Sequence, residues 1–524
     1  DIVLSGLTLT SNFNSIFGGY DLEDSYIYNS KFETSNTTRI QSYAYLVSHS
    51  NGMRESVMEN ITINFGATTV QFRANNYLDG QGYASGLIID RVEESRLASI
   101  DVTATVRSYT RSKDISGNLG VSLLVGNIDE TLMQSCSVDT KSPSMGLIGG
   151  PQITIDRGNG FGGLVYQATN STIVGVNGFR FNLKPSSSDS LNINIYSEAY
   201  VASGLVVAVM ANSKIMNMDI SVGQVDVRLN IYNTSGHVVK NAYIGGVVGE
   251  MKNSTMDTIT MRQNNSLEVN FDCDTSTSTQ EISIGGIVGR ISCNEFAWNR
   301  SKNGNALREI DINNVTSLIN LTVNFEDSNR VLRIENNNGL QPVQRCNVSG
   351  VVGSMINTRV GNLAAGNENS QPVLKVNMQW QIYSNNGLVT TSGINIAGVI
   401  GSMLYSELNS NQGIKAKNLT IDVTVSTALA NSNAAQKVWI AYGVANIGYN
   451  YNVQYNSIMY QNYFNVSNCS NSVKADSSRT YNLFALTNRE DMTACLTQST
   501  EGGWIYMDNS KKIQHFWIIS QSKF

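Results

Sequence analysis

One six-residue phrase recurs along the chain and constrains its fold more than any other feature. Its four closest copies are IGGVVG at 244–249, IGGIVG at 284–289, VSGVVG at 348–353 and IAGVIG at 396–401. Measured between central small residues, successive copies at 122, 163, 204, 246 and 286 lie 41, 41, 42 and 40 residues apart. A period this regular is typical of repeat proteins, in which each unit stacks on its neighbours around one continuous core.

Weaker copies extend the array in both directions. The gaps of 64 and 48 residues that end at Gly350 and Gly398 fit the same unit with loops inserted on one face. Residues 303–305 and 336–339, which are made of Asn and Gly, are the predicted inserted material. The predicted rungs are centred near residues 46, 86, 122, 163, 204, 246, 286, 350, 398 and 443.

Each unit is predicted to form three short strands, which in one copy cover 244–251, 255–261 and 267–271. Apolar and polar residues alternate in the second and third of these, as they do in strands with one buried face. We interpret the Gly-Gly step as steric, because stacked copies bring a neighbouring backbone too close for a side chain.

These features predict an all-β fold, a right-handed parallel β-solenoid (β-helix) of about 11–12 rungs with a repeat of roughly 40 residues. A rise of about 4.8 Å per rung makes this a rod on the order of 55 Å long. A β-propeller has a similar period, but the units contain three strands rather than four, and they lack the Trp-Asp signature of one propeller class.

The phrase Gly-Gly-Val-Val-Gly, followed by a short Asn-Ser turn and a second apolar strand, resembles the GLUG repeat of surface adhesins and related β-helical proteins. The resemblance covers most of residues 84–450. Residues 486–492, 502–506 and 516–519 are similar to the short helix and Trp-containing ending that often close such arrays. The resemblance implies a solenoid domain over residues 1–480, a C-terminal cap over 481–524 and a place at the cell surface.

Composition narrows the classes of partner. Charged residues make up 15% of the chain, against roughly 25% in ordinary soluble domains, so Asn, Ser and Thr must supply much of the polar surface. The net charge of -5 and the lack of clustered Lys and Arg argue against nucleic acid or an anionic membrane as partner. No apolar run reaches 18 residues, so we expect no membrane-spanning segment.

Two sets of residues are candidates for modification. Asn-x-Ser/Thr sequences would accept N-glycans in a eukaryotic secretory pathway, and six cysteines permit up to three disulfides but include no C-x-x-C pair typical of zinc sites. The candidate glycosylation sites are Asn36, Asn60, Asn170, Asn233, Asn253, Asn264, Asn299, Asn314, Asn320, Asn347, Asn418, Asn465 and Asn468. The cysteines are Cys136, Cys273, Cys293, Cys346, Cys469 and Cys495.

We expect no catalytic, cofactor or metal site. The three histidines, His49, His237 and His515, lie in no recognisable nucleophile or metal motif. A β-helical polysaccharide-active enzyme remains an alternative, since such enzymes use stacked carboxylates. Its candidate acids are Asp219, Asp257 and Asp311, or the pair Asp272 and Asp274, which could otherwise bind calcium at a turn.

The predicted function is that of a non-catalytic extracellular or cell-surface structural protein, a subunit of a fibre, filament or coat. Residues 2–10 begin as a strand, and an open strand end can pair head to tail with a second copy. The alternative is a monomeric adhesin or glycan- or receptor-binding stalk that displays loops at 303–308 and 328–342.

Overall fold

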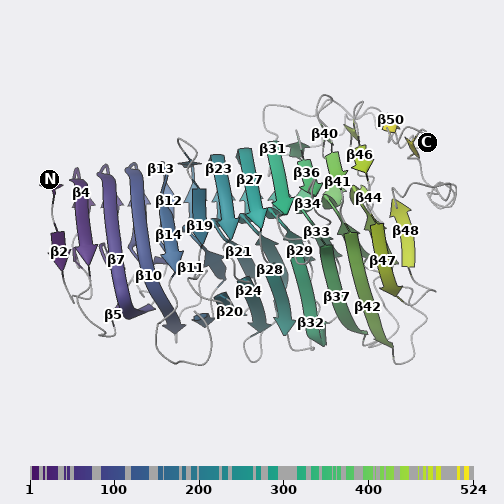
Figure 1. The fold of residues 1–524 in the computed structure, drawn as a ribbon, viewed down its shortest axis with the longest axis horizontal. Helices are drawn as coiled ribbons and strands as arrows, with labels where there is room; N and C mark the ends of the chain where they lie inside the picture. The colour runs from purple at the N-terminus through teal and green to yellow at the C-terminus, as the bar shows by residue number, and fades with distance from the viewer. Residues whose placement is uncertain are drawn as a thin grey trace, which may run out of the picture.

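The structure is a computed structural model. It describes residues 3–6, 8–10, 16–17, 21–33, 40–42, 44–47, 52–72, 84–111, 120–140, 152–156, 159–175, 180–183, 191–197, 200–222, 227–233, 239–263, 267–272, 281–292, 316–325, 332–340, 345–356, 358–360, 363–366, 373–382, 393–404, 407–408, 414–417, 420–429, 437–447, 458–459, 464–467, 470–475, 480–484, 504–507 and 513–517. All regular elements among these residues are strands. They stack coil upon coil along one long axis (Figure 1), which confirms the predicted all-β parallel solenoid.

A ten-stranded parallel sheet contains the first half of each recurring phrase. Its strands, in spatial order, are β8 (Ser85–Gly86), β11 (Gly120–Ser122), β16 (Gly160–Gly162), β21 (Tyr200–Gly204), β25 (Asn241–Gly245), β29 (Glu281–Gly285), β33 (Arg345–Ser349), β38 (Gly393–Ala397), β43 (Lys437–Ala441) and β48 (Thr480–Phe484).

An eleven-stranded parallel sheet contains the second half of each phrase. Its strands are β3 (Leu22–Glu23), β6 (Met53–Arg54), β9 (Ile89–Glu93), β12 (Val125–Asp129), β17 (Val165–Thr169), β22 (Val207–Ala211), β26 (Val248–Lys252), β30 (Val288–Ser292), β34 (Val352–Ile356), β39 (Ile400–Leu404) and β44 (Val444–Ile447). Each coil contributes one strand to this sheet, so the described chain makes the predicted number of coils. The right-handed sense of the coil stays a prediction.

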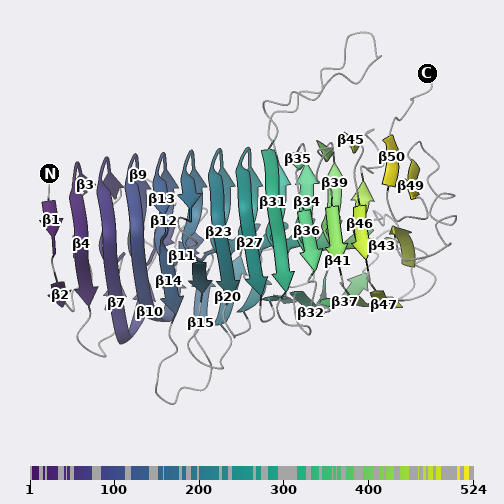
Figure 2. The ribbon, with the colours of Figure 1, turned by 45° about the horizontal axis from the view of Figure 1, so that its top comes forward.

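A 27-stranded sheet forms the remaining wall, and Figure 2 shows many of its strands side by side along the rod. In its first half the strands are β1 (Val3–Ser5), β2 (Thr8–Thr10), β4 (Tyr26–Glu33), β5 (Ile40–Ser42), β7 (Val57–Phe72), β10 (Arg96–Arg111), β13 (Leu132–Gln134), β14 (Ser137–Thr140), β15 (Gln152–Asp156), β18 (Thr172–Val174), β19 (Arg180–Leu183), β20 (Leu191–Ser197), β23 (Lys214–Val222) and β24 (Val227–Asn233). Those that follow are β27 (Thr255–Gln263), β28 (Leu267–Asp272), β31 (Thr316–Phe325), β32 (Leu332–Leu340), β35 (Thr358–Val360), β36 (Leu363–Gly366), β37 (Val373–Ile382), β40 (Glu407–Leu408), β41 (Ile414–Lys417), β42 (Thr420–Leu429), β45 (Ile458–Met459), β46 (Phe464–Ser467) and β47 (Ser470–Ala475).

The unit at 241–272 contains four strands where the sequence predicts three. A bend at Gly246 and Val247 divides the first predicted strand into β25 and β26, which belong to different sheets. The bend itself is stacked on the next coil, since Val247 N donates to Ile287 O at 2.8 Å. The residues on both sides of the bend are apolar, so the periodicity of the sequence does not reveal that the strand is interrupted there.

The register of the stack differs by one residue from the predicted alignment in five copies. The column of Ser122 and Gly204 continues through residues 162, 245, 285, 349 and 397, whereas the predicted alignment places residues 163, 246, 286, 350 and 398 in it. Two small residues follow each other in each of these copies, so the sequence does not distinguish the two registers, and only the strand pairing does.

The hydrophobic core runs through the described coils without a break. It extends from Leu22 near one end to Val444 near the other, and it is built mostly from Ile, Val, Leu and Met. Residues of one column meet their equivalents in the next coil, as Ile244, Ile284 and Val348 do. This stacking of like side chains explains why the phrase recurs with so little change.

The predicted insertions and the predicted C-terminal cap can be compared with the structure in part. Residues 336–339, predicted as loop, belong to β32, where the register shifts between Asn336 and Leu340, so the insertion is an irregularity in a strand. Residues 303–305 and the predicted helix at 486–492 lie outside the described residues. The Trp-containing end forms an antiparallel hairpin of β49 (Trp504–Met507) and β50 (Ile513–Trp517), and β48 straddles the predicted boundary at residue 480.

A ladder of buried hydroxyl groups lies at the turn that leaves the eleven-stranded sheet. The residue before each hydroxyl has a left-handed φ of 46 to 49°, as at Asn170, Asn212 and Asn253. Each hydroxyl donates to the carbonyl two residues earlier. The hydroxyls of Ser56, Ser95, Ser171, Ser213 and Ser254 also accept a backbone N–H from the preceding coil. The ladder members are Ser25, Ser56, Ser95, Thr131, Ser171, Ser213 and Ser254.

We expect Ser213→Ala to lower the free energy of unfolding by about 1–3 kcal/mol, because it leaves the buried N–H of Ser171 without the acceptor that lies 3.0 Å away. Ser213→Thr should retain most of the stability, since Thr131 occupies the equivalent turn of another coil and its hydroxyl likewise donates to the carbonyl two residues earlier. Urea unfolding followed by circular dichroism measures both variants. Equal losses in the two would show that the side-chain volume, not the hydroxyl, matters at this turn.

Candidate functional site

A narrow wedge lies between the ten-stranded and the eleven-stranded sheets, on the side of their strands opposite the main core. Small clusters separate from that core occupy it, such as Ala84, Tyr166 and Ala208. Close to the bend the two backbones leave no room for side chains, because a Cβ added to Gly245 would lie 1.9 Å from Val248 O. Farther from the bend the wedge widens and contains buried polar residues, which we call the wedge network.

Glu281 lies at the centre of the wedge network. Its Oε1 accepts hydrogen bonds from Ser283 Oγ at 2.9 Å and from Ser354 Oγ at 3.0 Å. Asn347 Nδ2 lies 3.5 Å from the same oxygen and donates to Ser283 Oγ at 3.0 Å. Asn395 Nδ2 extends the chain of hydrogen bonds to Asn347 Oδ1 at 2.8 Å. The network therefore joins three consecutive coils through side chains alone.

Charged and aromatic groups complete the network on the N-terminal side. Tyr200 donates to Glu250, and Arg290 donates to the hydroxyl of Tyr243. The Arg290 Cζ atom lies 4.8 Å from the centre of the Tyr243 ring, and Arg290 Nη1 lies 3.7 Å from Glu281 Oε2. Glu250, which is 2% exposed, also pairs with Lys252 at 3.4 Å. Two carboxylates and two cations thus balance one another in the wedge.

Burial makes the two tyrosines of the wedge network harder to ionise. Desolvation, and then the negative charge of Glu250, raise the pKa of Tyr200 well above its ordinary value. Desolvation also raises the pKa of Tyr243, with Glu281 adding to the effect. Both phenols therefore keep their protons at neutral pH. The carboxylates are occupied by fixed donors, so the arrangement is suited to holding two sheets in register rather than to proton transfer.

The sequence argument missed the wedge network. Glu250 and Arg290 each follow the final Gly of a recurring phrase, and Ser354 occupies the same place in the next copy. A polar residue at one fixed position of the repeat, beside apolar neighbours, was the available signal. Glu281 precedes its phrase and gives no comparable signal, because the equivalent residues differ from copy to copy.

Tyr45 is a buried tyrosine outside the wedge network, and it yields a prediction about how the stability of the protein depends on pH. Burial raises the pKa of Tyr45 to about 12, and its hydroxyl has no hydrogen-bond partner among the described residues. The unfolded chain ionises near pH 10, so the stability due to the neutral phenol is present below pH 10 and is lost between pH 10 and 12. Between these two pH values the contribution of Tyr45 to the free energy of unfolding falls by about 1.4 kcal/mol per pH unit.

We therefore expect Tyr45→Phe to be at least as stable as the parent protein at pH 7 and to lose less stability between pH 10 and 12. Urea unfolding at a series of alkaline pH values measures the difference in slope. Parallel pH profiles for the two proteins would contradict the assignment of a buried, neutral Tyr45.

The candidate glycosylation sites fall into distinct environments. Asn60, Asn170 and Asn253 are exposed, whereas Asn347 is 1% exposed and donates within the wedge network, so the folded chain cannot accommodate a glycan there. Three more lie in strands whose side chains are not described, namely Asn233, Asn320 and Asn465. Outside the described residues are Asn36, Asn264, Asn299, Asn314, Asn418 and Asn468.

Two cysteines predicted as disulfide partners are free. Cys136 and Cys346 are both buried, and desolvation raises the pKa of each thiol to about 12, which suppresses the reactive thiolate. Cys136 occupies a turn much like that of the hydroxyl ladder, and its Sγ lies 3.5 Å from Gln134 O. Neither of these two candidates forms a disulfide in the structure. Cys273, Cys293, Cys469 and Cys495 lie outside the described residues.

The residues considered for catalysis are not brought together where the structure describes them. Asp219 pairs with Thr260 in the sheet, and Asp257 pairs with Met216, three positions away along the same strand. His515 lies in β50 opposite Tyr506, and Asp272 ends β28. His49, His237, Asp274 and Asp311 lie outside the described residues. Within the described ranges, no three His, Cys, Asp or Glu side chains are placed to hold a metal ion.

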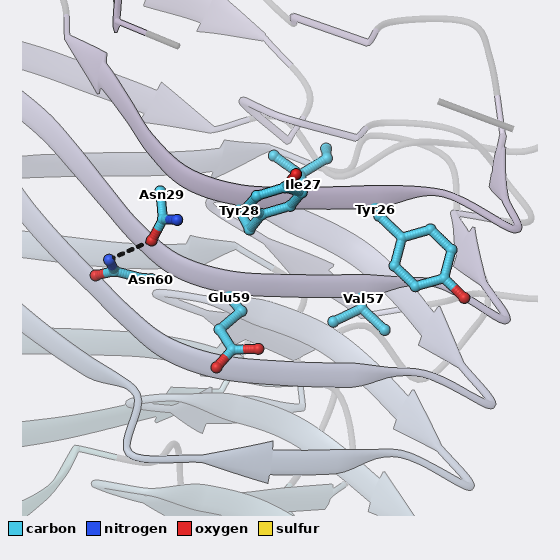
Figure 3. Close-up of a pocket in the computed structure, with 7 residues that line it drawn as sticks. All are labelled: Tyr26, Ile27, Tyr28, Asn29, Val57, Glu59 and Asn60. Atoms are coloured by element: carbon cyan, nitrogen blue, oxygen red, sulfur yellow. Dashed lines mark hydrogen bonds between the residues drawn. The ribbon is translucent and has the colours of Figure 1, made fainter. Parts of the chain in front are cut away.

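An open groove lies on the outer face of the first two coils, between β4 and β7. Figure 3 shows Tyr26 and Tyr28 on one strand beside Val57 and Glu59 on the next. The groove has a volume of about 400 Å³. We call it the tyrosine groove, and it is lined by Tyr26, Ile27, Tyr28, Asn29, Val57, Glu59 and Asn60.

Comparisons of the chain with known protein families, with curated proteins and with solved structures found no match. The resemblance to GLUG repeats therefore stays a prediction. The described part of the chain contains no helix with the length and apolar character that a membrane crossing requires.

Proposed function

We propose that this protein is a non-catalytic structural rod of the cell surface or extracellular space, a subunit of a fibre, filament or coat. The observation that carries the proposal is the register of the stack, in which equivalent residues of successive coils pair in parallel along the whole described rod. Such a stack is stabilised at every interface by the same contacts, so its length and stiffness are its principal properties.

Two features make the rod resistant to local opening. The hydroxyl ladder satisfies buried turn amides coil by coil, and the wedge network ties the two sheets that meet at the bend. Both sets of contacts bridge successive coils. A subunit that transmits force or fixes a spacing requires such contacts, whereas an enzyme requires a preorganised reactive site.

The geometry of the first described coil supports assembly through the ends. β1 and β2 pair on one side with β4, and no other described strand pairs with their second side. A parallel strand of another copy can extend the same ladder, and a head-to-tail contact of this type generates a filament. Val3, on this edge, is 67% exposed.

Negative-stain electron microscopy of the native protein, with sedimentation velocity over a range of concentrations, tests the proposal. We expect ordered filaments that Val3→Lys shortens or abolishes, because an edge lysine opposes strand pairing. Leu132→Lys, at an exposed position on the lateral wall, is the matched control and should leave the filaments intact. Dispersed rods at all concentrations would overturn the fibre proposal and favour a monomeric adhesin.

A further inference from the structure

The tyrosine groove presents two aromatic rings to solvent. Tyr26 and Tyr28 are 50% and 39% exposed, and they lie two residues apart on β4, about 6.8 Å along the strand. Neither phenol hydroxyl forms a hydrogen bond with any described residue. Tyr26 is opposite Val57, and Tyr28 is opposite Glu59. The groove therefore combines apolar ring faces with unused polar atoms.

One end of the tyrosine groove is held in place by an amide pair. Asn60 Nδ2 donates to Asn29 Oδ1 at 2.7 Å, as Figure 3 shows. Both residues have a left-handed backbone, with φ of 55° and 50°, so the two strands bend at the same position. The hydrogen bond leaves the Nδ2 donor of Asn29 and the Oδ1 acceptor of Asn60 available at the groove. A donor and an acceptor are thus fixed side by side.

The charge of the tyrosine groove is close to neutral. Glu59 pairs with Arg96 on β10 at 3.4 Å, and both side chains are exposed. The groove ends at this third coil, because Ala98 is the residue opposite Glu59 there. A cationic ligand would have to compete with Arg96 for the carboxylate. A ligand with many hydroxyls and no charge would not.

From these observations we propose that the tyrosine groove binds a neutral oligosaccharide. The C–H faces of sugar rings pack on the exposed tyrosine rings, and the sugar hydroxyls form hydrogen bonds with the phenols, the free amide atoms and Glu59. The volume lies within the range of about 300–1,000 Å³ of small-ligand pockets. The stacked strands hold these groups in place before binding, which lowers the entropic cost of association. This proposal does not depend on self-assembly.

Isothermal titration calorimetry of the full chain tests the proposal with two neutral probes, the β-1,4-linked hexamers of glucose and of N-acetylglucosamine. We expect one of them to bind with little dependence on salt, and Tyr26→Ala and Tyr28→Ala each to weaken binding by about tenfold or more. Leu132→Ala is the matched control for loss of an exposed apolar side chain on the same sheet and should bind as the parent does.

Two results would overturn the proposal. One is the absence of binding to both probes at millimolar concentration by protein with an unchanged circular dichroism spectrum. The other is binding that neither tyrosine substitution weakens. Binding of a proline-rich peptide that carries arginine, with loss on Glu59→Gln and strong sensitivity to salt, would assign the groove to a peptide instead.

Discussion

The Gly285→Ala variant is expected to lose about 3 kcal/mol or more of unfolding free energy. A Cβ at this position would lie 2.0 Å from Val288 O, 2.6 Å from Val351 O and 2.8 Å from Gly353 N. All three are backbone atoms, so none can rotate away as a side chain would. The strand is also paired on both sides, with Gly245 and with Ser349, which limits how far it can shift. Urea unfolding followed by circular dichroism measures the loss.

Ser349 provides the matched control, because it occupies the same column one coil later and already accommodates a Cβ. Its buried hydroxyl has no hydrogen-bond partner among the described residues. Ser349→Ala should therefore change the stability by less than about 1 kcal/mol, or increase it. If Gly285→Ala were as stable as the parent, the two sheets could not be as closely packed at the bend as the structure describes.

The contrast between Gly285 and Ser349 also shows what a repeat can predict. Near-identical phrases at a fixed period require equivalent positions to stack, and the parallel solenoid follows from that alone. The bend after Gly245 could not be predicted, because Ile244 and Val248 are both buried and the phrase looks like one apolar strand. Strand pairing, not composition, determines which of two adjacent glycines faces the neighbouring sheet.

The hydroxyl ladder could have been predicted from the sequence, whereas the wedge network could not. An Asp, Glu or Asn followed by Ser or Thr recurs once per coil from Ser25 to Ser254, at the position of a turn. The wedge network instead depends on contacts between residues far apart in the chain. Glu281 and Ser354, for example, are 73 residues apart in the chain and become neighbours only because their strands belong to successive coils.

The environments of Cys136 and Cys346 could not be inferred from the number of cysteines. Counting cysteines treats them as a separate chemical set, but Cys136 takes the place of a serine at a turn and Cys346 takes the place of an aliphatic residue in the core. In a solenoid the column in which a residue lies decides its environment. Ile282 is the partner of Cys346 in the preceding coil, and this column position predicts burial better than the residue type does.

Glu281→Ala is expected to lower the free energy of unfolding by about 3–5 kcal/mol, the usual cost of removing one member of a buried charged network. The loss arises because Ser283 and Ser354 no longer have their acceptor and Arg290 no longer has its anion. Arg290→Met should also destabilise the chain, because it leaves the carboxylate of Glu281 buried without a cation. Urea unfolding at pH 7 measures each variant.

The double variant Glu281→Gln, Arg290→Met, measured beside the matching single variants Glu281→Gln and Arg290→Met, distinguishes a charge pair from a set of independent contacts. The introduced amide would retain an acceptor for the two serines and would need no cation, so the double variant should be more stable than the sum of the two single losses predicts. The coupling energy of this cycle should reach about 0.5–3 kcal/mol. Strict additivity would mean that Glu281 and Arg290 act separately. A coupled pair would instead show that the carboxylate and the guanidinium, which lie on the two strands beside one bend, hold that bend together.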